Sequence, residues 1–248
     1  MKSFLKRATT IFIVIALVLA TVFVFWASDA SPASEVALQA LNSDLQTVVT
    51  IENGWVTFYP ANNLPPATGF IFYPGGKVDY RAYAPILKMI ASNGYFVALT
   101  PAPLNLAMFD INAAARIQAQ YPEIKNWFVG GHSLGGVAAS SYAGDHPDIK
   151  GVVLWGSNPA DDALKLKNIP TILMYGMNDG LISEQMMNDS LELLPVGSML
   201  VAIEGGNHAQ FGSYGFQSGD NEASISSEEQ WSQTVNATVE FFVEVLGK

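Results

Sequence analysis

Six short apolar runs, separated by segments of helix length, constrain the fold of this chain more than any other feature of its sequence. Continuous apolar runs of this kind are typical of a parallel sheet that is covered on both faces by helices. The final helix is expected from Ser226, which has capping-box spacing to Glu229. The pattern predicts an α/β fold with a mostly parallel central sheet. The expected strands are 69–74, 95–101, 126–131, 151–156, 170–176 and 198–205, and the other expected helices are 80–92, 110–121, 134–144 and 183–193.

A β-hairpin is expected ahead of these runs. The stretches TVVTI and WVTFYP flank an Asn53-Gly54 pair, which favours a two-residue hairpin turn. We find no boundary that would divide residues 47–248, so we expect one domain there. Residues 31–46 begin with Ser, Pro and Ala and are interpreted as a linker.

The first 30 residues differ from the rest. Three basic residues precede the stretch 8–28, which holds no charge. A helix of that length spans about 30 Å, enough to cross a bilayer. Residues 1–30 are therefore a membrane anchor or a signal peptide: the length favours a single-pass anchor, whereas Ser28-Asp29-Ala30 has the spacing of a cleavage site. Both alternatives export the domain, anchored in the cell membrane or secreted, because a basic flank stays cytoplasmic.

Charge and cysteine content exclude several classes of function. The formal net charge is −10 in 248 residues, which argues against a nucleic-acid-binding surface. The chain contains no cysteine, so disulfides, a thiolate metal site and a cysteine nucleophile are all excluded.

The stretch VGGHSLGG, residues 129–136, places Ser133 between an expected strand and an expected helix. Glycines two positions before and after the serine allow a strand and a helix to approach closely, as in a nucleophile elbow. The N–H of Leu134 would then lie at a helix N-terminus and face an oxyanion. The alternative is a glycine-rich turn that binds a phosphate or nothing, but the stretch lacks the P-loop lysine and the G-x-G-x-x-G spacing.

A serine nucleophile needs a base, and His208 is the best candidate among three histidines. His208 follows the last apolar run and so is expected at the same carboxyl edge of the sheet as Ser133. His132 lies within the turn itself, and His146 ends the following helix.

An acid is also needed to orient the imidazole, and Asp179 follows the penultimate apolar run. The chain order Ser133, Asp179, His208, each at a strand end, is that of the α/β-hydrolases. Asp161 and Asp162 are a second choice for the acid.

The second oxyanion donor is expected from the loop YPGGKVD. Gly75 and Gly76 allow the backbone to turn its N–H groups inward. We favour the N–H of Gly76 as the donor, with that of Lys77 as the second choice.

Four stretches together, YPGGKVDYRAYAP, GGHSLGG, YGMNDG and EGGNHAQFGSYG, resemble the α/β-hydrolase family over about residues 68–246. The chain is similar to its lidless members, such as dienelactone hydrolases and small carboxylesterases. The resemblance implies that Ser133 is the nucleophile, Asp179 the acid and His208 the base, with Gly76 and Leu134 as the oxyanion hole. Many relatives have a histidine where this chain has a proline before the two loop glycines.

We therefore expect a serine hydrolase that cleaves carboxylic esters or thioesters of small molecules through an acyl-enzyme. No cofactor and no metal are expected. The alternatives are a cofactor-free haloperoxidase or a peptidase on the same triad, and a non-catalytic binding module on a hydrolase scaffold.

No sizeable cap domain is expected, because only the 13 residues 157–169 separate two apolar runs where lidded lipases insert a cap. The resulting open cleft predicts a preference for short-chain esters. Candidate residues to line the site are Phe211, Tyr214, Phe216, Asn105 and Met108.

Overall fold

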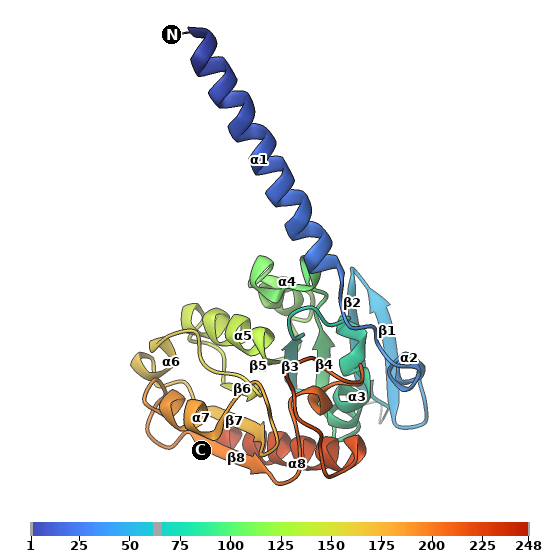
Figure 1. Ribbon diagram of the computed structural model, residues 1–248. Helices are drawn as coiled ribbons and strands as arrows, with labels where there is room; N and C mark the ends of the chain where they lie inside the picture. The colour runs from blue at the N-terminus through green and yellow to red at the C-terminus, as the bar shows by residue number, and fades with distance from the viewer. Residues whose placement is uncertain (1, 62–65, 248) are drawn as a thin grey trace.

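The computed structural model describes residues 2–61 and 66–247, and one eight-stranded sheet organises the domain (Figure 1). The strand order is β1-β2-β4-β3-β5-β6-β7-β8. The hairpin of β1 and β2 is antiparallel, β2 pairs antiparallel with β4, and every pair from β4 to β8 is parallel. The strands are β1 (Thr47–Glu52), β2 (Trp55–Pro60), β3 (Thr68–Tyr73), β4 (Phe96–Leu99), β5 (Asn126–His132), β6 (Gly151–Trp155), β7 (Thr171–Gly176) and β8 (Met199–Ile203).

Helices cover both faces of this sheet, which confirms the predicted α/β-hydrolase architecture. One face is covered by α3 (Ala84–Ser92) and α8 (Ser227–Leu246). The opposite face is covered by α4 (Ala113–Gln120), α5 (Leu134–Asp145), α6 (Ala163–Leu166) and α7 (Glu184–Leu191). The connection from β6 to β7 holds only the four-residue α6, so no large cap is present among the described residues.

The sheet order reverses beside β3, whose neighbours are β4 on one side and β5 on the other. In open α/β sheets, ligands bind at the carboxyl ends of the strands next to such a switch point. The loops after β3 and β5 therefore border the expected binding crevice.

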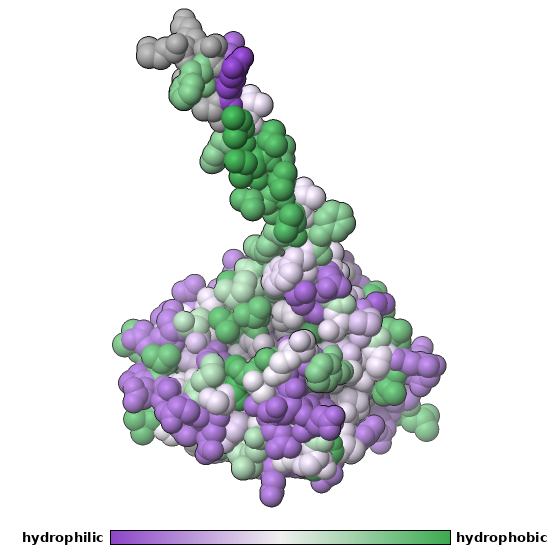
Figure 2. Space-filling model, in the orientation of Figure 1, coloured by the Kyte–Doolittle hydropathy of each residue, from purple (hydrophilic) through white to green (hydrophobic). Residues whose placement is uncertain are grey.

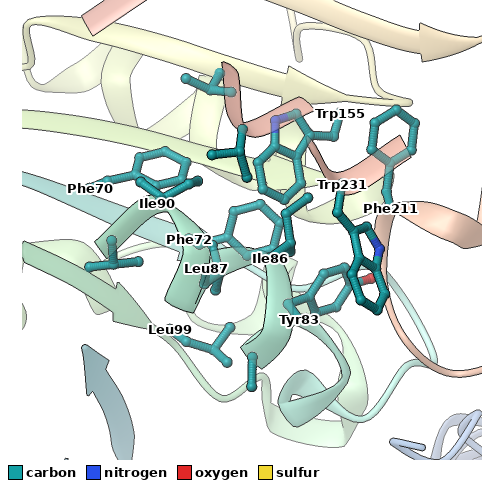
Figure 3. Close-up of a cluster of buried hydrophobic side chains, with 14 of the residues drawn as sticks. Phe70, Phe72, Tyr83, Ile86, Leu87, Ile90, Leu99, Trp155, Phe211 and Trp231 are labelled. Carbon is teal, nitrogen blue, oxygen red and sulfur yellow. The ribbon is translucent and has the colours of Figure 1, made fainter. Parts of the chain in front are cut away.

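An aromatic cluster of the core includes side chains from the carboxyl ends of β3 and β6 (Figure 3). The rings of Phe72 and Trp155 lie 4.6 Å apart, and the indole of Trp155 stacks on Phe211 at 6.2 Å. All three side chains are buried. Because Phe211 lies three residues after His208, this packing fixes the segment that directly follows the histidine.

The segment interpreted as a linker is docked on the domain. It contains α2 (Glu35–Ala40), whose first turn is capped by the hydroxyl of Ser34. The N–H of Ser34 donates to the carbonyl of Ser213 at 2.8 Å, and Ser31 forms a parallel bridge with Val78. Burial of Ala37 explains why this short amphipathic stretch packs instead of remaining free.

The N-terminal helix α1 (Lys2–Ser28) projects away from the domain (Figure 1). Its segment Thr9–Ser28 has a mean hydropathy of 2.7 and is long and apolar enough to cross a membrane. Figure 2 shows this segment as a hydrophobic column that stands clear of the globular part. Its last two turns pack on the domain, where Ala27 is fully buried.

Candidate active site

Ser133 lies at the turn between β5 and α5 with a strained backbone, φ 51° and ψ −124°. A positive φ is uncommon for a residue with a side chain and marks a position where the surrounding structure imposes strain. The side chain of Ser133 is partly exposed, whereas His132 before it is buried. This geometry is that of a nucleophile elbow.

The neighbouring glycines make the turn possible. A Cβ atom at Gly131 would lie 2.3 Å from the backbone of Gly135, and one at Gly135 would lie 2.2 Å from the carbonyl oxygen of Tyr73. Both separations are too short for real atoms, so any larger residue would push α5 away from the sheet. Glycine at these positions brings the start of α5 against the loop after β3.

His208 and Asp179 contact each other in the protein interior, at the carboxyl ends of β8 and β7. The imidazole Nδ1 lies 2.7 Å from Asp179 Oδ2, and both side chains are almost fully buried. The other carboxylate oxygen, Oδ1, accepts hydrogen bonds from the N–H groups of Leu181 and Ile182 at 2.8 and 2.7 Å. The carboxylate is thus held on one side by the backbone and presents its second oxygen to the imidazole.

The second imidazole nitrogen, His208 Nε2, is buried and has no hydrogen-bond partner among the described residues. Ser133 is therefore not hydrogen-bonded to it in this structure. The two residues are nevertheless joined through their neighbours. His132, which precedes Ser133, packs on His208 with ring centroids 4.4 Å apart. The Ser133 N–H donates to the carbonyl of Trp155, and the next residue, Gly156, lies against the His208 imidazole. The site so formed presents His208 Nε2, without a hydrogen-bond partner among the described residues, beside the turn that holds Ser133.

The oxyanion donors expected from the sequence can be compared directly. The N–H of Lys77 donates to the carbonyl of Asn105 at 2.8 Å, so this second choice is already engaged. The N–H of Gly76 donates to no described group. Leu134 is the first residue of α5, so its N–H has no acceptor within the helix. The arrangement favours Gly76 and Leu134 over Lys77.

Tyr83 and His132 brace the loop that contains Gly75 and Gly76. The Tyr83 hydroxyl accepts from the N–H of Gly75 at 3.0 Å and lies 2.8 Å from His132 Nδ1. This buried pair supplies side-chain support to the loop after β3, in which a proline precedes the two glycines. No sequence motif indicated it, because Tyr83 is separated from His132 by 49 positions.

Asp161 and Asp162, the second choice for the acid, lie away from the imidazole. Asp161 is exposed and accepts from the N–H of Ala163 at the start of α6. Of the residues considered for the lining, Phe211 and Tyr214 are buried in the core, while Phe216 is exposed.

Asp220 is a buried acid whose importance the sequence did not reveal. Its carboxylate accepts from the N–H groups of Gly180, His208, Ala209 and Asn221 at 2.8 to 3.3 Å. It therefore ties the loop of His208 to the loop of Asp179 through backbone N–H groups.

Replacement of Asp220 by asparagine is expected to destabilise the fold by about 1–3 kcal/mol, because an amide NH₂ would face the N–H of Ala209 and leave it unsatisfied. Hydrolytic turnover should fall together with stability, as the His208 loop loosens. The measurement is thermal unfolding of Asp220→Asn beside Glu222→Gln, a neighbouring exposed acid. Equal stability of the two variants would contradict the bracing role.

Burial lowers the pKa of His132 well below its usual value, and the neighbouring His208 lowers it further. A histidine held neutral in the folded state contributes stability above its unfolded pKa of about 6.5, and this contribution is lost as the pH falls. The unfolding free energy should therefore decrease below about pH 6.5, by at most about 1.4 kcal/mol per pH unit for this one proton. A shallower decrease is expected for His132→Asn. The check is the melting temperature from pH 7.5 to 5, and identical slopes would refute the assignment.

Comparison with known proteins places this geometry in a family. The model of the Alpha/beta hydrolase family matches residues 69–232, which contain the whole candidate site. No curated protein matches the sequence.

Several solved structures share the fold at low sequence identity. The esterase domain of a Rhodothermus marinus protein has a TM-score of 0.58 at 16% identity, covering 78% of this chain and 95% of its own. A thermophilic esterase from Thermogutta terrifontis has a TM-score of 0.54 at 17% sequence identity, and the match covers 81% of this chain and 92% of the esterase. Dienelactone hydrolase from Anabaena variabilis has a TM-score of 0.58 at 20% sequence identity, and the match covers 80% of this chain and 98% of the hydrolase.

Proposed function

Because this chain belongs to the α/β-hydrolase family, we propose that it is a serine hydrolase that cleaves carboxylic esters or thioesters of small molecules. The observation that carries the proposal is the site at one sheet edge: a serine at a strained turn, and a buried imidazole fixed by a carboxylate at 2.7 Å with its other nitrogen free. Solved esterases with the same fold support the ester-bond assignment.

In the proposed reaction, the Ser133 hydroxyl attacks the ester carbonyl carbon while His208 Nε2 accepts its proton. Asp179 holds the imidazole through Nδ1 and stabilises the imidazolium. The N–H groups of Gly76 and Leu134 donate to the oxygen that becomes negative. His208 then protonates the leaving alcohol or thiol. In the second half of the reaction His208 takes a proton from water, which attacks the acyl carbonyl carbon, and the imidazolium returns that proton to the departing Ser133 oxygen.

We also propose that Thr9–Ser28 is an uncleaved single membrane span with the domain on the extracytoplasmic side. The support is the length and hydropathy of this helix and the basic residues that precede it. A mature protein that begins at Ser31 would show instead that the helix is a cleaved signal peptide.

A fluorophosphonate probe tests the activity without knowledge of the substrate, because it labels only an activated serine. We expect the full-length protein in detergent to incorporate one probe per chain at Ser133. Absence of labelling in the folded protein would favour a binding module, and a panel of ester, thioester and amide substrates would separate esterase from peptidase activity.

A further inference from the structure

The last turn of α1 docks on the catalytic edge of the domain. The Asn105 side-chain NH₂, in the loop after β4, donates to the carbonyl of Ala27 at 3.0 Å. The Lys77 ammonium lies 4.8 Å from the ring centre of Trp26 and 3.8 Å from Asp29. Since Lys77 directly follows Gly76, the end of the helix touches the loop that carries the proposed oxyanion donor.

With Thr9–Ser28 as the proposed membrane span, a second contact sets the depth of this edge relative to the bilayer. The rings of Phe23 and Phe109 meet edge to face with centroids 6.0 Å apart. Thr9–Ser28 has 20 residues, so it spans about 30 Å and needs its whole length to cross the hydrocarbon core. Phe23 lies five residues before Ser28 and therefore about 8 Å inside that boundary. Phe109 must then lie at the level of the lipid surface.

The residues around Phe109 are suited to that position. The 3₁₀ turns η2 (Pro103–Asn105) and η3 (Ala107–Phe109) expose Leu104, Met108 and Phe109 by 38%, 41% and 55%. We refer to these three side chains as the apolar rim. An interfacial tryptophan, here Trp26, is typical of the end of a membrane-spanning helix.

The apolar rim leads to the candidate site. Leu106, between the two turns, and Leu134, next to Ser133, both lie against Gly76. A cavity of about 450 Å³ opens beside Gly76 and is bounded by residues 29–32, 76–78, 217 and 218, so the segment that follows α1 forms one of its walls. An ester that reaches Ser133 from the membrane side would pass over this rim.

We propose that the apolar rim rests in the surface of the bilayer that holds α1, and that the substrates are amphiphilic acyl esters dissolved in that leaflet. The substrate class rests on the proposed serine-hydrolase function. Such substrates require no lid, because the hydrocarbon chain stays in lipid while only the ester group enters the site. A short-chain preference among water-soluble esters is compatible with this arrangement.

The membrane contact can be measured without any activity. The chain has no cysteine, so single cysteines can be introduced in the full-length protein and labelled with the fluorophore NBD. Phe109→Cys reports on the rim. Val196→Cys is the matched control, because Val196 is also an apolar residue, is fully exposed, and lies before β8 at the amino ends of the parallel strands, away from the carboxyl edge.

In phosphatidylcholine nanodiscs we expect blue-shifted NBD emission at position 109 and water-like emission at position 196. Replacing the lipid by its brominated form should remove most of the emission at 109 and leave 196 unchanged. Water-like, unquenched emission at 109 would overturn the proposal. Blue-shifted emission that bromination leaves intact would also overturn it, by indicating a protein partner on the rim.

The substrate class is tested with Phe109→Ser and the control Val196→Ser. We expect Phe109→Ser to lower hydrolysis of a long-chain ester embedded in liposomes severalfold and to leave hydrolysis of p-nitrophenyl acetate in solution unchanged. Equal losses on both substrates would overturn the proposed substrate class. If the hydrolase function itself fails, the wild type is inactive on both substrates, while the NBD measurement still reports the position of the rim.

Discussion

Replacement of Ser133 by alanine should lower kcat/KM for p-nitrophenyl acetate by about 10⁶, to the level that the remaining site provides. The alanine keeps Cβ and the backbone turn but removes the only oxygen that can form the acyl bond. Because the strained φ of 51° is imposed by the contacts of Gly131 and Gly135, the fold should be retained. The loss should therefore lie in kcat, with an unchanged melting temperature.

Ser141→Ala provides the matched control for this prediction. Ser141 lies on α5, the helix that follows Ser133, and is partly exposed like Ser133. This variant should retain wild-type activity and full labelling by fluorophosphonate. Residual ester hydrolysis in Ser133→Ala above about one per cent of the wild type would place the nucleophile elsewhere.

Asp179→Asn is expected to lower kcat by about 10⁴, because the substitution forces the wrong tautomer of His208. Two backbone N–H groups, from Leu181 and Ile182, donate to Oδ1, so an amide NH₂ at that position would face two donors without an acceptor. The asparagine must therefore direct its NH₂ at His208 Nδ1. The imidazole then accepts at Nδ1 and carries its proton on Nε2, where it cannot take the proton of Ser133.

The measurement is the pH profile of kcat for Asp179→Asn and for Asp161→Asn, which alters an exposed acid just before α6. Asp161→Asn should match the wild type throughout. A loss below about tenfold for Asp179→Asn would show that the carboxylate does not set the tautomer.

The parallel strands could be predicted closely from the sequence because burial on both faces leaves a continuous apolar run. The expected run 151–156 corresponds to β6 at Gly151–Trp155, in which every residue is buried, and the hairpin turn at Asn53-Gly54 is confirmed. The helix expected over 110–121 begins later, at Ala113, because Asp110 pairs with Arg116 and the preceding residues form a turn.

The candidate site was predictable to the extent that chain order and strand ends determine it. Ser133, Asp179 and His208 each follow a strand, and parallel strands bring their carboxyl ends to one edge. Asp220 could not be inferred in the same way. Its role depends on hydrogen bonds to backbone groups 11 to 40 positions away, and backbone groups carry no sequence signal.

The docking of residues 31–46 escaped prediction for a related reason. The six residues of α2 are too few to form a stable helix alone, so the segment is ordered by contacts with the domain. A local pattern of Ser, Pro and Ala does not reveal such contacts.

The bridge between Ser31 and Val78 has a consequence for the maturation of the chain. The N–H of Ser31 donates to Lys77, and its carbonyl accepts from Asp79, so the backbone on one side of the Ala30–Ser31 bond is clamped. Proteases cut segments that can leave the folded surface. Cleavage at this bond would therefore have to precede formation of the bridge. Once the domain has folded, the bridge protects the link between α1 and the domain, in agreement with the proposed uncleaved span.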